Sequence, residues 1–235
     1  MQQNHKGSFL VFEGLDGAGK STQVNLLGEY LDRQKIPYRF MHFPRTDAPW
    51  FGELVARFLR GEFGSLETVD PYIVALLYAG DRHHAADIIR TWLKAGELVI
   101  VDRYVYSNIG FQCAKLKGNE EQDRLRNWIY SIEYEHFRIP KPQLTIFLDV
   151  PFSFTESKLT GEREGEDRCY LEGKKDIHES DLNFQGRVRE IYLQQAAKEE
   201  NFEIIACSDD AKNMLPPDKI FSKILDCLKK HRLIN

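Results

Sequence analysis

The sequence has few cysteines and no excess of positive charge. Its four cysteines, Cys113, Cys169, Cys207 and Cys227, are widely spaced and form no C-x-x-C pair, which argues against a disulfide framework and against a zinc site. The formal net charge of the 235 residues is −4, so the surface as a whole does not suit long nucleic acid. We therefore expect reduced thiols and no polymeric nucleic acid partner, with any anionic ligand held by local arginines and lysines.

Long hydrophobic runs are also missing. No apolar stretch approaches the ~18 residues that a membrane span needs. The start of the chain, MQQNHKG, is short and polar and does not resemble a signal peptide. We expect a cytoplasmic protein with no membrane partner.

What the sequence does contain is a glycine-rich turn between a strand and a helix. Residues 8–22 read SFLVFEGLDGAGKST, an apolar run followed by the pattern G-x-x-x-x-G-K-[ST] at residues 14–21 and then a helical segment. Glycines there let backbone N–H groups wrap closely around a polyphosphate, and the helix adds its positive N-terminal end. Lys20 is expected to contact the β- and γ-phosphates, and Ser21 to bind Mg²⁺. The sequence thus predicts a nucleoside triphosphate site formed by Gly14, Gly17, Ala18, Gly19, Lys20, Ser21 and Thr22.

Five short apolar runs predict the strands of an α/β fold. Because they are apolar throughout rather than alternating, they indicate a parallel sheet with helices on both faces, a P-loop sandwich in one domain over residues 1–235. The expected strands are 9–12, 38–43, 98–101, 144–150 and 202–206. The expected helices are 19–34, 51–60, 70–95, 107–116, 121–137, 152–160, 183–200 and 217–231.

One segment departs from this pattern. Residues 160–181 are rich in glycine and charge and have few core residues, which predicts a mobile surface lid. Asp176, His178 and Glu179 lie in it, and we interpret them as solvated groups rather than as a metal site.

A second polar cluster follows the third predicted strand. Asp102 and Arg103 end that strand, and the carboxyl ends of parallel strands face the ligand, so both should emerge beside the phosphate loop. A carboxylate at this position can organise Mg²⁺ through its water shell, and a guanidinium can clamp a second phosphate. Asp102 joins Ser21 as a predicted metal-site residue.

Together these motifs resemble the thymidylate kinase family. The matching residues are 13–22, the Phe-Pro-Arg run at 43–45, LYAGDR at 77–82, and DRYVYSN at 102–108, and the resemblance spans residues 9 to about 195. It implies a homodimeric enzyme that phosphorylates dTMP to dTDP with ATP and Mg²⁺.

The resemblance also implies roles on the nucleoside side. Asp16 would accept a hydrogen bond from the 3′-hydroxyl, and Tyr78 would stack on thymine. Arg82 would donate to O4 of the base, Asn108 would meet its N3 edge, and Phe111 would crowd the 2′ carbon. The full predicted substrate set is Asp16, Phe43, Arg45, Tyr78, Arg82, Arg103, Ser107, Asn108 and Phe111.

The resemblance also implies which cationic side chains surround the transferred phosphate. Arg45 and Arg103 resemble clamps for the acceptor phosphate. Some relatives carry an arginine where this chain has Gly17, so the transition-state cation should come from the lid. The predicted catalytic residues are Lys20, Asp16, Arg103, Arg163 and Arg168.

Two other functions compete with this interpretation. The phosphate of dTMP has a second pKa of about 6 and needs no general base, whereas a deoxynucleoside kinase must deprotonate a 5′-hydroxyl, for which Glu13 or Asp102 could serve. A nucleotide-dependent switch of the GTPase type is the other alternative. No N-K-x-D run for guanine recognition occurs in the sequence, which counts against it.

Overall fold

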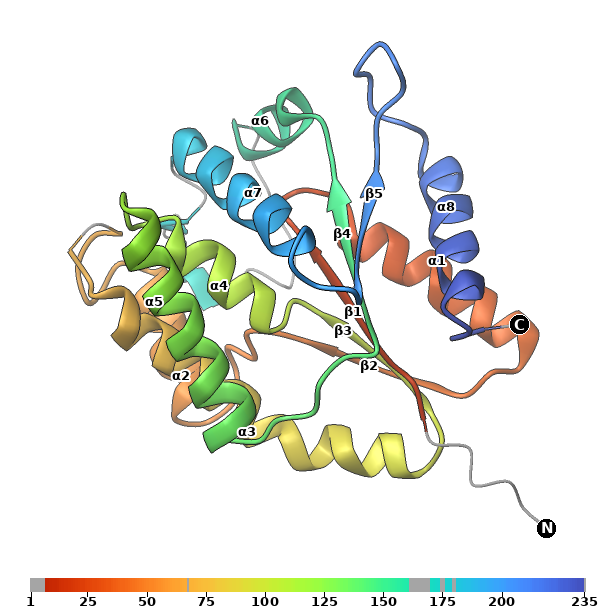
Figure 1. Cartoon of the computed structure of the whole chain (residues 1–235), viewed down its shortest axis with the longest axis horizontal. Helices are drawn as coiled ribbons and strands as arrows, with labels where there is room; N and C mark the ends of the chain where they lie inside the picture. The colour runs from red at the N-terminus through yellow and green to blue at the C-terminus, as the bar shows by residue number, and fades with distance from the viewer. Residues whose placement is uncertain (1–6, 67, 161–169, 174–175, 179–180, 235) are drawn as a thin grey trace.

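The computed structural model describes residues 7–66, 68–160, 170–173, 176–178 and 181–234 (Figure 1). At its centre is a sheet of five parallel strands in the order β2-β3-β1-β4-β5. The strands are β1 (Phe9–Gly14), β2 (Tyr38–His42), β3 (Leu98–Asp102), β4 (Leu144–Asp149) and β5 (Phe202–Ala206). The predicted fold class, a five-stranded parallel sheet flanked by helices, is confirmed.

Helices cover both faces of this sheet (Figure 1). One face is covered by α1 (Lys20–Gln34) and α8 (Pro217–Lys230), and the other by α3 (Pro71–Lys94), α4 (Val105–Cys113), α5 (Asn119–Tyr130) and α7 (Leu182–Ala196). The remaining helices are α2 (Phe51–Leu59), the π-helix η1 (Ser131–His136) and α6 (Phe152–Thr160). A single helix predicted over 121–137 is therefore α5 followed directly by a π-helix.

The central strand shows why the apolar runs are continuous. Phe9 and Val11 of β1 pack into the core beneath α3, α4 and α7, whereas Leu10 and Phe12 pack beneath α1 and α8. Successive side chains of a strand point to opposite faces, so a strand covered on both faces is apolar at every position. The expectation that all five strands are buried on both faces is wrong for the edge strands β2 and β5, where Phe40 and Ile204 are exposed.

Two helix starts near the pocket have side-chain caps. Asp70 accepts from the backbone N–H of Tyr72, with Pro71 as the first helical residue of α3. Asp181 accepts from the backbone N–H of Phe184 at the start of α7. Such caps satisfy N–H groups that a helix leaves unpaired at its N-terminus. The Asp181 cap fixes the start of α7 one turn before Gln185, a residue of the site described below.

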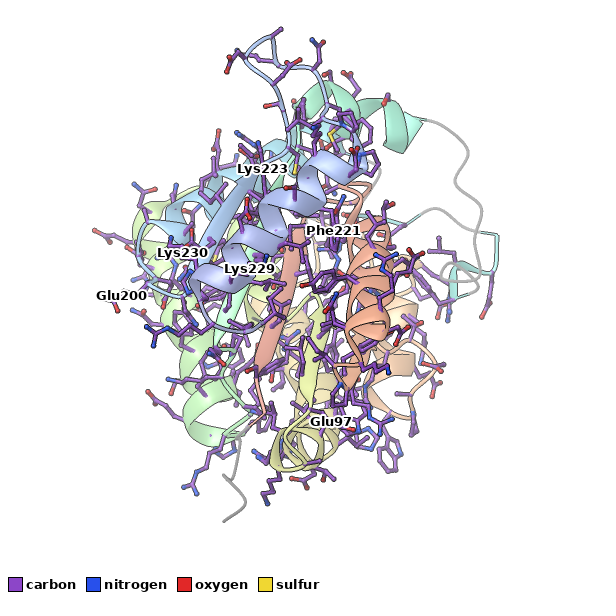
Figure 2. The ribbon with its side chains drawn as sticks, turned by 90° about the vertical axis from the view of Figure 1, so that its right-hand side faces the viewer. Glu97, Glu200, Phe221, Lys223, Lys229 and Lys230 are labelled. Atoms are coloured by element: carbon purple, nitrogen blue, oxygen red, sulfur yellow. The ribbon has the colours of Figure 1, made fainter. Side chains whose placement is uncertain are left out.

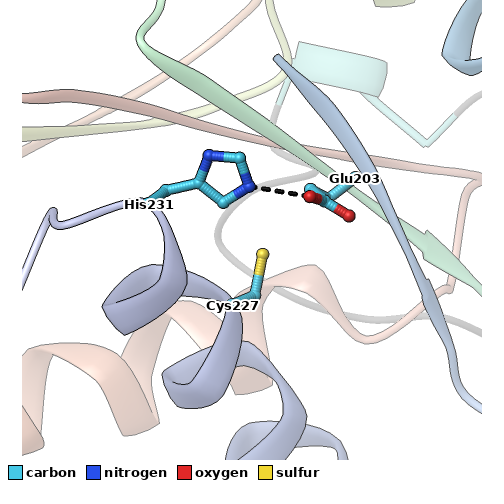
Figure 3. Close-up of side chains that lie close together, drawn as sticks. All are labelled: Glu203, Cys227 and His231. Carbon is cyan, nitrogen blue, oxygen red and sulfur yellow. Dashed lines mark hydrogen bonds and ion pairs between the residues drawn. The ribbon is translucent and has the colours of Figure 1, made fainter. Parts of the chain in front are cut away.

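The end of α8 carries a cluster of metal-ligating residue types (Figure 3). Glu203 of β5 accepts from His231 Nε2 at 2.7 Å and from Lys230 Nζ at 2.6 Å, and Cys227 lies beside them. Burial raises the pKa of the Cys227 thiol to about 11. A thiol is a poor metal ligand until it loses its proton, and the Lys230 ammonium already neutralises the carboxylate. We interpret this cluster as an ion-pair contact between α8 and β5.

The outer surface of α8 is basic and its inner surface packs on α1. Figure 2 looks onto this helix and labels Lys223, Lys229 and Lys230 along it. The Phe221 ring contacts Tyr30 of α1, with ring centroids 6.2 Å apart. Among the described residues no helix is long and apolar enough to cross a membrane.

Candidate active site

A pocket of about 930 Å³ opens at the carboxyl ends of β1 and β3. The register of these two strands pairs Phe12 with Asp102, so the turns that follow them lie side by side. Most of the predicted site residues form the pocket wall. They are Asp16, Gly17, Ala18, Gly19, Lys20, Ser21, Thr22, Arg45, Tyr78, Asp102, Arg103, Ser107, Asn108 and Phe111. Arg163 and Arg168 lie outside the described residues.

The phosphate loop has the backbone that its glycines predict. Gly17 and Gly19 have φ angles of 74° and 81°, a region that side chains disfavour. Lys20 Nζ donates to the carbonyls of Gly14 and Leu15, at 3.4 and 3.2 Å. Burial lowers the pKa of Lys20, against the opposing effect of nearby carboxylates. The lysine is thus held inside the loop, directed at carbonyl oxygens that a phosphate can replace.

An ion pair crosses the pocket from β3 to the phosphate loop. Arg103 Nη2 donates to Asp16 Oδ1 at 2.7 Å, and Nη1 donates to Ser107 Oγ at 3.2 Å. Burial acts to raise the pKa of Asp16, but Arg103 and Lys20 outweigh it and hold the pKa at about 2. Arg103 itself has a φ of 66°, and its backbone N–H donates to Phe12 O at 2.8 Å. The main chain therefore turns sharply at the residue whose side chain enters the pocket.

Glu13 stabilises this turn through hydrogen bonds to its carboxylate. Its carboxylate is fully buried and accepts from the backbone N–H groups of Tyr104 and Ser107, from Ser107 Oγ, and from the Tyr192 hydroxyl at 2.8 Å. Burial raises its pKa. Glu13 is not on the pocket wall. The sequence analysis offered it as a possible general base, but the structure uses it to hold the start of α4.

Asp102 is the wall residue that fits a metal ion best. Its Oδ2 lies 3.4 Å from His42 Nδ1, whereas its Oδ1 is buried with no partner among the described residues. Burial acts to raise its pKa, but Lys20 and His42 outweigh burial and lower it, so Asp102 carries a negative charge. Mg²⁺ prefers such hard oxygen ligands and often keeps part of its water shell. Asp102 and the Ser21 hydroxyl on the same wall fit the predicted metal.

The opposite end of the pocket presents amide groups. Asn108 and Gln112 are one turn apart on α4 and both are on the wall. Asn108 Oδ1 and both amide atoms of Gln112 are buried with no partner among the described residues. The Tyr78 ring and the Phe111 ring complete this end. Gln112 was missed in the sequence, although its spacing of four residues from Asn108 could have indicated it.

Three predicted residues lie behind the wall. Gly14 is the last residue of β1. Phe43 is buried, with its ring 5.8 Å from that of Tyr104. Arg82 is also buried, and it donates twice to Glu133, at 2.6 and 2.7 Å. None of these three residues lies on the pocket wall. The ligand contacts predicted for them stay predictions.

Arg45 lies on the pocket wall and is held there by the carboxylate of Asp81. Its Nε donates to Asp81 Oδ1 at 2.9 Å, and its backbone N–H donates to Asp81 Oδ2 at 2.8 Å. Asp81 is buried on α3, so the loop after β2 is attached to that helix. This arrangement keeps the guanidinium at the pocket with a defined direction.

Residues 170–173 and 176–178, part of the predicted surface lid, contact the end of α2, and Asp176 is not solvated as expected. The backbone N–H of Ile177 donates to Leu59 O at 3.1 Å, and Arg60 Nη1 donates to Tyr170 O at 2.8 Å. Asp176 is buried and accepts from the Tyr170 hydroxyl at 2.7 Å. These described residues therefore pack on the end of α2. The charged composition of the segment does not indicate that Asp176 is buried there. Glu179 lies outside the described residues.

His178 was also predicted to be solvated, and this too is wrong. Its ring is 6 % exposed and packs against Phe111, Phe58 and Phe184, with centroids 4.8, 5.5 and 5.8 Å away. Burial lowers the pKa of His178 to about 3, so the ring is neutral. Its Nε2 is buried with no partner among the described residues. His178 is therefore an uncharged part of the pocket wall.

Gln185 joins this wall to the phosphate loop. Its Nε2 donates to Asp16 Oδ2 at 3.0 Å and to His178 O at 2.8 Å. The residue is fully buried on the first turn of α7. Nothing in the sequence near Gln185 indicated this contact, because Asp16 lies 169 residues away.

The sequence profile of the thymidylate kinase family matches residues 12–215. A probable thymidylate kinase of Pyrobaculum aerophilum is 32 % identical over 225 residues, which cover 95 % of this chain and 97 % of that protein. A thymidylate kinase of Mycobacterium tuberculosis is 31 % identical over 190 residues, covering 80 % of this chain and 86 % of that protein.

A solved structure has the same fold. The thymidylate kinase of Candida albicans superposes with a TM-score of 0.72 at 23 % identity, covering 98 % of this chain and 96 % of the other. The two folds thus match over nearly the whole length of the present chain. With the profile and the relatives, this pocket identifies the chain as a member of the thymidylate kinase family, and so as an ATP-dependent nucleoside monophosphate kinase.

Proposed function

We propose that this pocket transfers the γ-phosphoryl group of ATP to dTMP, giving dTDP. The observation that carries the proposal is the presence of two cationic regions on one wall. Lys20 lies in the phosphate loop, and Arg45 and Arg103 lie nearby, each held by a buried or half-buried carboxylate. A donor triphosphate needs the first region. An acceptor that is already a phosphate needs the second, whereas a nucleoside does not.

The remaining wall supports a deoxynucleoside on the acceptor. Tyr78 offers a ring for stacking, and Asn108 offers an unpaired amide oxygen to the edge of a base. Asp16 is ionised and can accept from a 3′-hydroxyl. Phe111 fills the space beside the Arg103 guanidinium, 5.2 Å from its ring centroid, where a 2′-hydroxyl would be crowded. These roles are proposals that the position of each side chain supports.

The chemistry that these residues supply is positioning and charge. The acceptor phosphate is largely a dianion at neutral pH, with a second pKa of about 6, so no protein base is needed. Glu13 is committed to four hydrogen bonds and does not reach the pocket. Lys20, Arg45 and Arg103 bring two anions together and offset their repulsion. Ser21 and Asp102 would hold Mg²⁺, which neutralises charge on the phosphates when bound. Arg163 and Arg168 stay proposed sources of a further cation.

A direct assay separates this proposal from its rivals. The protein is mixed with ATP and Mg²⁺ and given dTMP, thymidine or no acceptor, and products are separated by anion exchange. We expect dTDP from dTMP, no dTMP from thymidine, and only slow ADP formation without acceptor. Phosphorylation of thymidine would make the protein a nucleoside kinase. ATP hydrolysis at the same rate in all three mixtures would support a nucleotide-dependent switch.

We propose a homodimer that pairs through α3. Ile73, Leu76 and Ile88 are exposed on this helix at 59 %, 39 % and 44 %, and Trp50 lies against His84 beside them. Exposed apolar residues that recur along one helix are typical of an interface. Leu76→Glu should halve the mass measured by sedimentation, whereas Ile204→Glu, an exposed apolar residue on β5, should leave it unchanged. A monomeric wild-type protein would contradict the proposal.

We also propose that the chain works as one kinase domain in the cytoplasm. Its described helices all pack on one sheet. Cys113, Cys207 and Cys227 are free and buried, as is usual for proteins of reducing compartments.

A further inference from the structure

Glu133 is a fully buried carboxylate behind the pocket. It belongs to the π-helix η1 and is the buried residue of that helix. Its Oε2 accepts from Arg82 Nε at 2.6 Å, and its Oε1 accepts from Arg82 Nη2 at 2.7 Å and from Asn108 Nδ2 at 3.0 Å. One carboxylate thus contacts the two residues predicted to meet O4 and N3 of the base. Turns of π-helix are frequent at functional sites.

The contacts of Asn108 fix which way its amide faces. Nδ2 donates to Glu133 Oε1 and also to the carbonyl of Ala75, both at 3.0 Å. A carboxylate and a carbonyl can only accept, so both amide hydrogens of Asn108 are committed and the group cannot turn over. Its Oδ1 is buried with no partner among the described residues. The polar atom that Asn108 has left for a ligand is therefore an acceptor.

The same carboxylate fixes Arg82 as a donor. Its Nε and Nη2 are bound to Glu133, and these bonds leave Nη1 as the nitrogen with hydrogens directed elsewhere. A guanidinium has no acceptor atom. Arg82 can thus only donate, but it lies behind the pocket wall, whereas Asn108 lies on the wall and keeps an acceptor for a ligand. Thymine and uracil carry an acceptor at O4 and a donor at N3, whereas cytosine carries a donor at C4 and an acceptor at N3.

We infer that Glu133 is a positioning residue for base selection, which holds Asn108 with its amide oxygen toward the pocket as an acceptor and so favours thymine over cytosine. Glu133 does not touch the ligand itself, because it is absent from the pocket wall. It acts through Asn108, whose amide would otherwise be held only by one hydrogen bond to Ala75 O, and which donates to N3 of cytosine only when turned over. The inference rests on the proposed function, since it takes dTMP as the acceptor.

The test compares Glu133→Gln with wild type on dTMP, dUMP and dCMP. Glutamine has the same shape, but its amide N–H group takes the place of one carboxylate oxygen. Where it replaces Oε1 it faces Asn108 Nδ2, and the Asn108 amide is then held only by the Ala75 carbonyl. We expect the ratio of kcat/KM for dTMP over dCMP to fall at least about tenfold, mainly through KM. The ratio for dTMP over dUMP should change less than about threefold, because these two bases share O4 and N3–H. Ratios measured on one preparation are independent of the fraction of folded protein.

Controls separate this role from a structural one. Glu135→Gln alters an exposed carboxylate of the same helix and should leave both ratios unchanged. Glu133→Asp keeps the buried charge beside Arg82 and should give an intermediate dTMP/dCMP ratio if Glu133→Gln fails to fold. In an Asn108→Ala background, Glu133→Gln should add less than about a twofold change. Equal losses on all three substrates, or an undiminished effect without Asn108, would overturn the inference. Failure of wild type to phosphorylate dTMP would instead overturn the proposed function.

Discussion

Two walls of the pocket are built in different ways. The phosphate loop is one continuous stretch after β1, and its own backbone N–H groups, two left-handed glycines and Lys20 make the site. The other wall, residues 170–173 and 176–178 with Gln185 behind them, is assembled by contacts from α2 and α7 that lie far apart in the chain. The first wall depends on local conformation and the second on tertiary packing.

We expect the two walls to serve different steps, the phosphate loop the transfer of the phosphoryl group and the assembled wall the binding of the substrate. Lys20 lies in the phosphate loop, and among the described residues its Nζ makes hydrogen bonds with its own loop alone. Gln185 and His178 lie near Asp16 and Phe111, the residues proposed to contact the sugar, and their contacts hold the wall itself. We therefore expect substitutions in the loop to change kcat, and substitutions in the assembled wall to change KM and stability.

The largest effect is expected for Lys20→Ala. Loss of the loop cation should lower kcat by at least about 10³-fold, because it removes charge stabilisation that is needed most in the transition state. The fold should persist, since Lys20 bonds only to carbonyls of the loop that carries it. Steady-state kinetics and the thermal unfolding midpoint measure the two quantities.

Lys229→Ala on the outer surface of α8 (Figure 2) is the matched control and should change neither quantity. If Lys20→Ala retains activity within about tenfold of wild type, the phosphate loop does not supply the main catalytic charge, and the proposed difference between the two walls fails.

The second prediction concerns the free energy of unfolding of the protein and how it changes with pH. His178, a residue of the assembled wall, should contribute to this change. The pKa of His178 is about 3 in the folded protein, against an ordinary value of 6.5. The unfolded chain therefore binds more protons between these two values, and the free energy of unfolding falls as the pH falls through this window. From about pH 7.5 to about pH 5 the loss assigned to His178 is about 2 kcal/mol.

His178→Gln removes this titration, so the wild type should lose about 2 kcal/mol more than the variant over the same pH range. Urea unfolding at both pH values measures the difference, and other titrating groups cancel in it. Parallel pH curves for the two proteins would mean that the ring is not held neutral in the folded wall.

The sequence predicted what is local. The five apolar strands, the phosphate loop and the position of Asp102 and Arg103 all follow from patterns within a few residues of one another, and the structure brings the loop, Asp102 and Arg103 to one pocket. The predicted helix at 121–137 was correct in extent, but a π-helical end cannot be distinguished from an α-helix by apolar periodicity.

The residues that were missed or misjudged depend on distant partners. Glu13 was quoted as part of a motif, yet its four hydrogen bonds come from α4 and α7. His178 lies in a charged segment that predicts solvent exposure, and Glu133 and Gln185 are polar residues of helices. All three are buried because other elements bring matching donors, acceptors and rings to them. A buried polar group is stable only where such partners exist, and a single sequence does not show them.

The smallest effect, and the sharpest comparison between the walls, is expected for Gln185→Leu. Leucine fills a similar volume but leaves Asp16 Oδ2 and His178 O without their donor. Loss of a buried hydrogen bond costs about 1–3 kcal/mol, part of which should appear as weaker binding of the nucleoside. We expect KM for dTMP to rise about tenfold, with kcat changed less than about threefold. Gln194→Leu makes the same replacement at an exposed position of α7 and should change neither constant. A fall in kcat with unchanged KM for Gln185→Leu would place this residue with Lys20, on the chemical side, and the division between the two walls would fail.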